Sequence, residues 1–353
     1  MPPPTQGWHV ARPADATRPA TIFAALSRLR FSSLALAVIL AGVVTGGGIS
    51  GSLAVLTSSR AVGSNTFTTA ASFDTVAPTA SASVIAKSGQ YFAGFARQGG
   101  TYYVYASATD GGAVPSGIAT IRADVSAITT GQTAVALIAG SYTVQGVTYG
   151  FRSAVLTATS PLTAGSKSYS LTLADNNGNS RTQAGFALTA DNTAPTASDV
   201  QAANGGATVG RVEAGDTITY TFSEVVDPES IAAGWTGVSA LNVVVRFTNT
   251  TTDTYAVWNA ANTAQLPLGS VNTNGNYVTT NVTAGASGTP STMVLNTVNR
   301  TIRITLGTIS GTVTTDSFSR TEAWTPSSSA FDRAGNAMST TSANESGAAD
   351  RDF

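Results

Sequence analysis

The feature of this sequence that most limits its fold is a two-residue alternation of apolar and hydroxyl side chains. In the run 217–223 every second residue is apolar, so Ile218, Tyr220 and Phe222 share one face of an extended chain. Strands that are apolar on one face and polar on the other belong to antiparallel sheets with one buried face. Runs with the same period are Tyr169–Leu173, Ala119–Val125, Val243–Phe247 and Ile302–Leu306.

An internal repeat shows how the strands are grouped along the 353 residues. The run Asp74–Ser81 (Asp-Thr-Val-Ala-Pro-Thr-Ala-Ser) returns as Asp191–Ser198 (Asp-Asn-Thr-Ala-Pro-Thr-Ala-Ser). A boundary sequence that recurs at this distance indicates two modules in tandem. Pro78 and Pro195 mark the junctions, because proline fixes an extended geometry and removes no ladder donor at the first residue of a strand.

These marks divide the chain into five parts. Residues 1–54 are a leader and residues 55–74 a polar linker. Residues 75–191 form the first module and residues 192–345 the second module, and residues 346–353 are a tail that we expect to fray. We therefore predict an all-β protein with two tandem antiparallel sandwiches after an apolar leader helix.

Each module has a turn signal near its end and about seven expected strands, the number that an immunoglobulin-type sandwich needs. The sequence D-x-x-G-N occurs at Asp175 and again at Asp332. Asp, Asn and Gly tolerate left-handed backbone geometry, so this sequence predicts a tight turn before a final strand. A helical pattern is nearly missing, apart from a short turn at Pro228–Ala233.

Residues 1–54 have the pattern of a secretory signal peptide. Arginines, the last of them Arg30, precede an uncharged stretch whose apolar centre, 34–44, is shorter than the roughly 20 residues of a membrane-spanning helix. Small residues precede a cleavage site that we place between Ala54 and Val55. The alternatives are an uncleaved leader, which would be the chain's link to a membrane, and a buried core helix.

The region around the cleavage site carries a resemblance. Residues 46–58 (Gly-Gly-Gly-Ile-Ser-Gly-Ser-Leu-Ala-Val-Leu-Thr-Ser) and 63–68 (Gly-Ser-Asn-Thr-Phe-Thr) resemble the signal region of camelysin-type and biofilm-fibre matrix proteins. That family shows G-x-x-A-x-F-T/S-D followed by N-x-F, and this chain has leucine and serine where the family has phenylalanine and aspartate. The resemblance implies export by a dedicated signal peptidase, and so an extracellular or cell-surface location.

The residue types behind most enzyme chemistry are missing. The chain has no cysteine and one histidine, His9, which lies in the predicted leader, so thiolate chemistry and a Ser-His-Asp relay are excluded from the mature chain. A net charge of −1 with 10% charged residues gives no basic surface for nucleic acid. We predict a protein that is not an enzyme, with no catalytic residue, no cofactor and no nucleic-acid partner.

Four acidic residues are candidates for Ca²⁺ sites, because carboxylate oxygens are ligands that Ca²⁺ prefers. Asp110 and Asp175 are the candidates in the first module, and Glu224 and Asp227 follow a strand of the second module. Two alternatives stay open. These residues are solvated loop acids, or Glu224 and Asp227 are the acid and base of a glycosidase.

Three tryptophans belong to the expected mature chain: Trp235, Trp258 and Trp324. Exposed, coplanar tryptophans stack on sugar rings and would make a carbohydrate-binding module. Isolated tryptophans in a β-sandwich otherwise pack in the core or at its rim. Exposure of two of them on one face separates these two hypotheses.

The modules resemble bacterial immunoglobulin-like repeats. The first has Ala106-Ser-Ala-Thr-Asp110 followed by Ser-Gly-Ile-Ala, and the second has Gly215-Asp-Thr-Ile-Thr-Tyr-Thr-Phe-Ser-Glu224 followed by D-x-x-G-N. These sequences are similar to repeat frames of large bacterial adhesins and surface-layer proteins. The resemblance implies tandem immunoglobulin-like sandwiches and a spacer or adhesive role at the cell surface, without catalysis.

Leader and modules together predict a secreted or cell-surface structural or adhesive protein. Its edge strands are rich in Thr and Val and poor in Lys, which favours self-association by strand addition. A cell-surface glycan or protein is the other predicted partner. The alternative functions are a carbohydrate-binding or host-surface-binding module and an accessory domain of an extracellular glycoside hydrolase.

Overall fold

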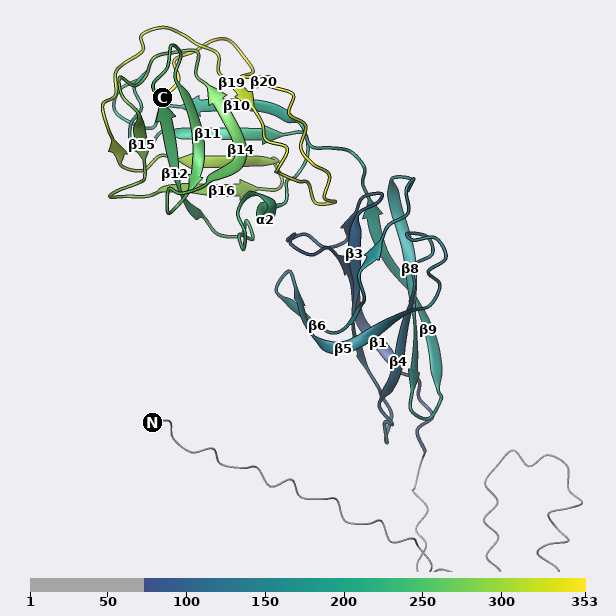
Figure 1. Ribbon diagram of the computed structural model, residues 1–353. Coiled ribbons are helices and arrows are strands. Elements are labelled where there is room, and N and C mark those ends of the chain that lie inside the picture. The colour runs from purple at the N-terminus through teal and green to yellow at the C-terminus, as the bar shows by residue number, and fades with distance from the viewer. Residues whose placement is uncertain (1–72) are drawn as a thin grey trace, which may run out of the picture. The chain divides into compact units, whose positions relative to one another are not determined.

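A computed structural model describes residues 73–353 and shows an all-β protein (Figure 1). The strands form two sheets, one within residues 75–191 and the other within residues 192–345. Buried apolar residues gather separately under each sheet. The all-β prediction is therefore confirmed, with two sheets that follow each other along the sequence.

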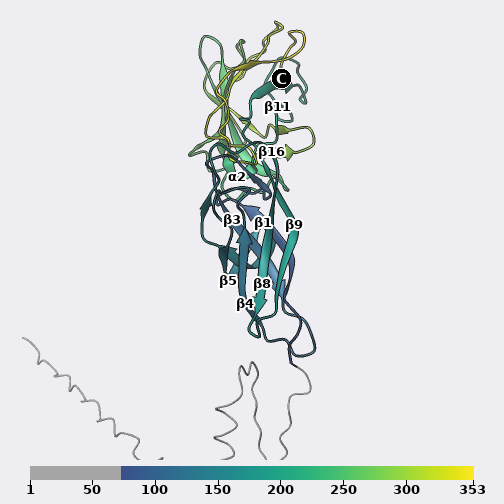
Figure 2. The same cartoon turned by 90° about the vertical axis from the view of Figure 1, so that its right-hand side faces the viewer.

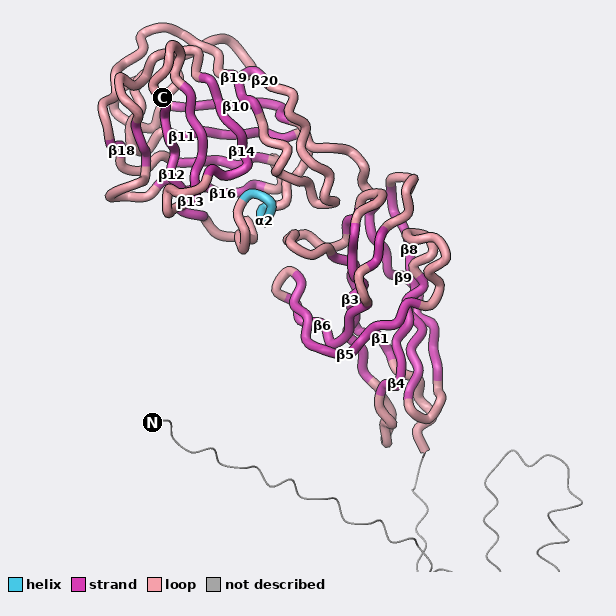
Figure 3. Tube along the Cα trace, in the orientation of Figure 1, coloured by secondary structure: helices cyan, strands magenta, loops and turns pink. Residues whose placement is uncertain are grey.

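One helix occurs in the described chain, α2 (Pro228–Ile231), which is cyan in Figure 3. It lies where the sequence predicts a short turn. No helix within residues 73–353 has the length and apolar character needed to cross a membrane. The predicted leader and its cleavage site between Ala54 and Val55 lie outside the described residues.

The first sheet has nine strands in the order β1-β3-β6-β5-β4-β8-β9-β2, with β7 paired to β3. Neighbouring strands are antiparallel except β2 and β9, which run parallel. Figure 2 shows β8 beside β9, its antiparallel partner. The strands are β1 (Thr79–Ala86), β2 (Phe95–Ala96), β3 (Thr101–Thr109), β4 (Ile118–Asp124), β5 (Val135–Val144), β6 (Val147–Ser153), β7 (Leu156–Thr157), β8 (Gly165–Asp175) and β9 (Ser180–Ala190).

The second sheet has eleven strands, and its main order is β10-β11-β17-β16-β12-β13-β14-β19-β20. Strand β15 pairs with both β12 and β18. All pairs are antiparallel. The strands are β10 (Ala197–Ala203), β11 (Thr217–Phe222), β12 (Leu241–Thr248), β13 (Thr254–Asn259), β14 (Gln265–Asn272), β15 (Val282–Ala284), β16 (Ser291–Asn296), β17 (Thr301–Thr305), β18 (Ile309–Ser310), β19 (Ala323–Thr325) and β20 (Ala343–Asn344).

In most of the strands with alternating sequence, the apolar residues are buried and the polar residues between them are exposed or partly exposed. On β11, Ile218, Tyr220 and Phe222 are buried while the threonines between them are partly exposed. Strands β8 and β17 follow the same rule. Strand β12 departs from it, because Val244 is fully buried although the pattern places it on the polar face. Both faces of β12 are therefore covered.

Strand β4 also departs from the predicted pattern. We expect Ala119, Ile121, Ala123 and Val125 on one buried face, but Ala119 is exposed and the other three are buried. The cause is a β-bulge. The pairing of β4 with β8 shifts between Ile118 and Thr120, which leaves Ala119 as the extra residue and turns it out of the core.

An aromatic group forms the centre of the core of the second module. Trp324 is fully buried, and its ring meets those of Tyr220 and Phe222 edge to face, with centroids 4.9 and 5.2 Å apart. Its indole Nε1 donates a hydrogen bond to the Leu268 carbonyl at 2.6 Å. Strand β19 is thereby tied to β11 and β14.

The tail at 346–353 does not fray, contrary to the expectation from its polar sequence. Asp352 and Phe353 are fully buried. The Phe353 ring packs on those of Phe247, Tyr255 and Tyr277 at centroid distances of 5.3–6.0 Å. The buried ring and the hydrogen bonds of the segment, among them Gly210 N–H to the Phe353 carbonyl and the Asp350–Arg320 backbone pair, together offset the entropy of ordering it. Eight residues without periodicity do not reveal the pocket of that ring.

Replacing Trp324 by Phe tests the aromatic core. Loss of ring volume and of the donor to Leu268 lowers the free energy of unfolding by about 2–4 kcal/mol. The matched change Trp258→Phe, at a partly exposed position, costs less than about 1 kcal/mol. Urea unfolding of both variants measures the difference, and equal losses would contradict the assigned core.

Candidate metal centres at the module junctions

The two repeated sequences meet in space at the start of the first module. The side-chain amide of Asn179, the last residue of D-x-x-G-N, donates through Nδ2 to the backbone oxygen of Asp74 at 3.0 Å. The same nitrogen donates to Oδ2 of Asp175 at 2.7 Å. The turn before the last strand of the module, β9, thus holds the residue that directly precedes the module.

The second module repeats this arrangement. Nδ2 of Asn336 donates to the backbone oxygen of Asp191 at 2.9 Å and to Oδ2 of Asp332 at 2.8 Å. In both turns the aspartate Oδ1 accepts two backbone N–H groups, which in this module are those of Ala334 and Asn336. We call this pair of asparagine hydrogen bonds the junction lock.

The glycine of each turn is required by its backbone. Gly178 and Gly335 have φ angles of 89° and 91°, a left-handed region that side chains disfavour. The D-x-x-G-N prediction of a tight turn is therefore correct in its local geometry. The sequence does not show that the turn binds the opposite end of its own module.

A third carboxylate completes a cluster at each lock. Asp74, Asp110 and Asp175 bring carboxylate oxygens within 4.8 Å of one another in the first module. Asp110 directly follows β3. Oxygens bound to one Ca²⁺ at about 2.3–2.6 Å lie at most about 5 Å apart, so the cluster has the dimensions of a Ca²⁺ site.

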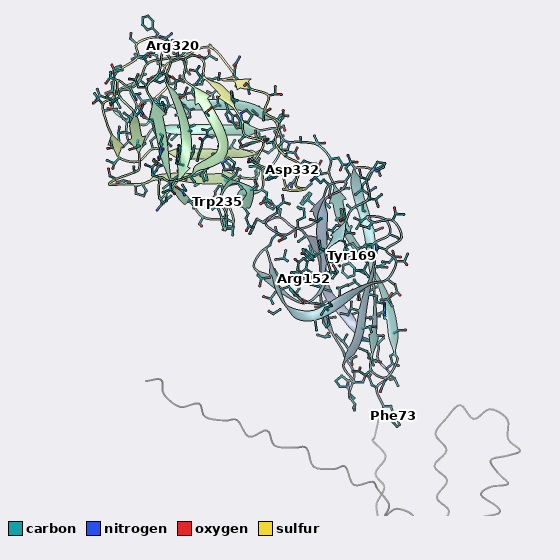
Figure 4. The ribbon with its side chains drawn as sticks, viewed as in Figure 1. Phe73, Arg152, Tyr169, Trp235, Arg320 and Asp332 are labelled. Atoms are coloured by element: carbon teal, nitrogen blue, oxygen red, sulfur yellow. The ribbon has the colours of Figure 1, made fainter. Side chains whose placement is uncertain are left out.

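The equivalent cluster of the second module consists of Asp191, Glu224 and Asp332, again within 4.8 Å. Glu224 stands two residues after β11. Figure 4 labels Asp332. Of the four predicted Ca²⁺ candidates, the structure thus gathers Asp110 with Asp175 in one cluster and places Glu224 in the other.

Hydrogen bonds occupy part of the first cluster. Asp74 accepts the N–H groups of Val76 and Ser116, and Oδ2 of Asp110 accepts that of Gly117 at 2.7 Å. Oδ1 of Asp110 is buried and has no hydrogen-bond partner. A buried oxygen without a partner is costly unless a cation or water binds it.

The second cluster shows the electrostatic cost of gathering three acids. Burial, and then the charges of Asp332 and Asp191, raise the pKa of Glu224 to about 7 against the opposing charge of Arg333. Burial also raises the pKa of Asp332. None of the three acids belongs to an ion pair found within residues 73–353. A bound divalent cation would neutralise this cluster.

Asp227, the fourth predicted candidate, has another role. It is fully buried, and its oxygens accept the N–H groups of Tyr91, Phe92 and Glu229, each at 3.0 Å. The last of these bonds caps α2. Asp227 belongs to neither carboxylate cluster, and its two oxygens accept these three N–H groups.

The tryptophans do not form an exposed pair in the described chain. Trp324 and Trp235 are buried, and only Trp258 is partly exposed. Trp258 lines a groove of about 470 Å³, but Cζ of Arg246 stands 3.5 Å from its ring centroid and covers one face. The feature that would favour sugar stacking is therefore not found.

Sequence reasoning missed three members of the clusters as ligand candidates: Asp74, Asp191 and Asp332. The repeated sequences nevertheless pointed to them. Asp74 and Asp191 begin the two D-x-x-A-P repeats, and Asp332 begins the second D-x-x-G-N sequence. Their role follows only from the antiparallel path that returns the end of each module to its beginning.

No protein-family model matches the chain, and no curated protein matches it. Its function is therefore inferred from the arrangement of its own residues.

Asn179→Ala tests the junction lock. Removal of Nδ2 leaves the Asp74 carbonyl and one oxygen of Asp175 without their donor, and lowers the free energy of unfolding by about 1–3 kcal/mol. Asn177→Ala, an exposed position in the same turn, changes it by less than about 0.5 kcal/mol. Chemical denaturation measures the free energy of unfolding of both variants. If the junction lock does not stabilise the fold, the unfolding curves of Asn179→Ala and Asn177→Ala will coincide.

Proposed function

We propose that this chain is an exported structural or adhesive protein of the cell surface, built from two immunoglobulin-like modules with a rigid junction. The observation that carries this proposal is the junction lock, which occurs with the same residues and nearly the same distances in both modules. Two modules of the same kind, each closed by the same junction lock, suit a spacer protein, because a spacer needs length and stiffness.

Asp191 supports the rigidity of the joint, because both modules hold its backbone. Its N–H donates to the carbonyl of Ala96 in β2 of the first module at 3.0 Å. Its carbonyl accepts Nδ2 of Asn336 in the second module at 2.9 Å. Both backbone polar groups of Asp191, between the last strand of one sheet and the first strand of the next, are therefore hydrogen-bonded.

A second set of bonds between the modules supports the same conclusion. Asp227 of the second module accepts the N–H groups of Tyr91 and Phe92, which follow β1. Nζ of Lys87 donates to the carbonyl of Arg333 at 2.5 Å. Burial lowers the pKa of Lys87 to about 8, against the charges of Asp227 and Asp332. A partly buried lysine and a buried aspartate so placed favour one relative orientation of the modules.

In this proposal Ca²⁺ is the ion of the two junction clusters. Its support is the convergence of three carboxylates at each lock and the unpartnered buried oxygen of Asp110. An ion there would bind the entry to a module (Asp74) to the turn before its last strand (Asp175). It would act as a brace, and the proposal assigns no catalytic step to the chain.

Self-association is the partner interaction that the sheet order supports best. Strands β1 and β10 stand at the ends of their sheets, each with a single strand neighbour in the order. Neither contains a lysine or a proline, the residues that protect edges against strand addition. Addition of a strand from a second copy would extend the array laterally.

The proposal is tested by locating the mature protein in its own cells. Antibodies against residues 73–353 are expected to label the intact cell surface or extracellular fibres, and N-terminal sequencing of the secreted form is expected to begin at Val55. Recovery of the chain only from the cell interior, with its leader intact, would contradict the proposal.

Calcium is tested by thermal unfolding of the full chain with CaCl₂ or with a chelator. Binding to the native state raises Tm in calcium, and Asp110→Asn reduces this rise because it removes one ligand charge. The control variant is Asp124→Asn, because Asp124 lies outside the clusters and accepts the backbone N–H of Ser126. This variant is expected to keep the full rise of Tm in calcium. An unchanged response in Asp110→Asn would remove Ca²⁺ from the first junction.

A further inference from the structure

A third group of acids lies in the second module, away from the junction. Glu345, Asp350 and Asp352 bring carboxylate oxygens within 4.8 Å of one another. Glu322, which precedes β19, contacts this group, because its backbone N–H donates to Oε2 of Glu345 at 3.0 Å. We call these four residues the tail cluster.

Two members of the tail cluster are fully buried and incompletely bonded. Glu322 and Asp352 have no exposed surface. One oxygen of each accepts a tyrosine hydroxyl, from Tyr255 at 2.7 Å and from Tyr277 at 3.3 Å. The other oxygens, Oε1 of Glu322 and Oδ1 of Asp352, have no hydrogen-bond partner. Buried carboxylate oxygens left in this state call for a positive charge.

No side chain of the described residues supplies that charge. The two ion pairs found there join Arg211 to Glu213 and Arg320 to Asp316. Both lysines of the chain lie before residue 192, and the one histidine is His9.

The acids of the tail cluster also repel one another. Burial, and then the charge of Asp352, holds the pKa of Glu322 well above its usual range. Burial, together with the charges of Glu345 and Asp350, raises the pKa of Asp352 to about 7. The converging carboxylates and the two buried oxygens without partners are the donors of a cation site.

We propose that Glu322, Glu345, Asp350 and Asp352 bind one Ca²⁺, and that this ion holds the C-terminal residues in the second module. The carboxylates of Glu345, Asp350 and Asp352 converge within 4.8 Å, and the buried Glu322 carboxylate accompanies them, so that oxygens free of hydrogen bonds contribute to the roughly six to eight that Ca²⁺ takes. Their spacing matches oxygens around one ion at about 2.3–2.6 Å. Asp350 is exposed, so the site has an open side through which an ion enters.

The structural effect of the ion follows from where the ligands come from. Asp350 and Asp352 belong to the tail, whereas Glu322 and Glu345 lie beside β19 and β20. The tail is also held by the paired backbone bonds of Asp350 with Arg320, by hydrogen bonds of Arg351 and Phe353 to the loop 209–210, and by the buried Phe353 ring. A cation bound between the two sets of acids would replace their mutual repulsion by attraction and would attach the tail to the strands β19 and β20.

This site is separate from the junction clusters. Figure 4 shows Arg320, whose backbone pairs with that of Asp350, far from Asp332 of the second junction. The inference therefore goes beyond the proposed function and does not rest on it. Either site can fail its test while the other passes.

The test uses Tb³⁺ as a luminescent substitute for Ca²⁺ on the purified full chain. Tyr255 and Tyr277 bond to cluster carboxylates, so Tb³⁺ bound there emits when tyrosine is excited, and Ca²⁺ displaces it. Glu322→Gln and Asp352→Asn keep the shape of the site and are expected to weaken Tb³⁺ and Ca²⁺ binding by about tenfold or more. Asp110→Asn, a junction variant, is expected to keep the tyrosine-excited emission.

A second measurement follows the tail itself. Trypsin cleaves after Arg351 when the tail detaches, and CaCl₂ is expected to slow this cleavage in the original chain but not in Glu322→Gln. Glu322→Gln is also expected to keep Tm nearly unchanged in the presence of chelator, because glutamine keeps the shape of the buried side chain. Retained stability without calcium separates loss of an ion site from simple damage to the fold.

Two results would overturn the proposal. One is tyrosine-excited emission and calcium-dependent protection in Glu322→Gln and Asp352→Asn equal to those of the original chain. The other is an original chain whose tail is cleaved at the same rate with CaCl₂ and with chelator. If Asp110→Asn alone loses a calcium response, the junction proposal stands and the tail site is rejected.

Discussion

One asparagine side chain at the end of each module fixes how that module closes. Nδ2 of Asn179 or Asn336 has two hydrogens, and it gives one to an aspartate carboxylate and the other to the backbone carbonyl that begins the module. The bond to the carboxylate is charge-assisted and therefore strong. Because the carboxylate also organises the turn, the end of the chain segment, its turn and its beginning form one bonded unit, and the third acid of each cluster stands beside it.

Much of the fold could be predicted from the spacing of apolar residues. The faces of β8, β11 and β17 follow the alternation, because burial on one face leaves its period in the sequence. The exceptions have local causes that the pattern does not contain. A bulge in β4 turns Ala119 outward, and cover on both faces of β12 buries Val244. The exposure of Ala119 and the burial of Val244 therefore depend on the surrounding strands and not on the type of residue at these positions.

The sequence singled out some members of the carboxylate clusters, and the other members come close only through pairing of distant segments. Asp110 and Asp175 were candidates because acids near turns are common ligands, but Asp74 joins them only once the sheet closes. The tail cluster was not predicted at all. Glu322 and Asp352 lie in a stretch of polar sequence without periodicity, and their burial follows from the docking of Phe353 against rings from β12, β13 and the loop that holds Tyr277.

The double attachment of Asp191 limits how such a chain can evolve. Its amide belongs to the hydrogen-bond network of one module and its carbonyl to that of the next. An inserted residue at this position would move one of the two out of reach, so length cannot be added there gradually. A longer relative would have to gain a whole module at once, complete with its own D-x-x-A-P entrance and D-x-x-G-N exit.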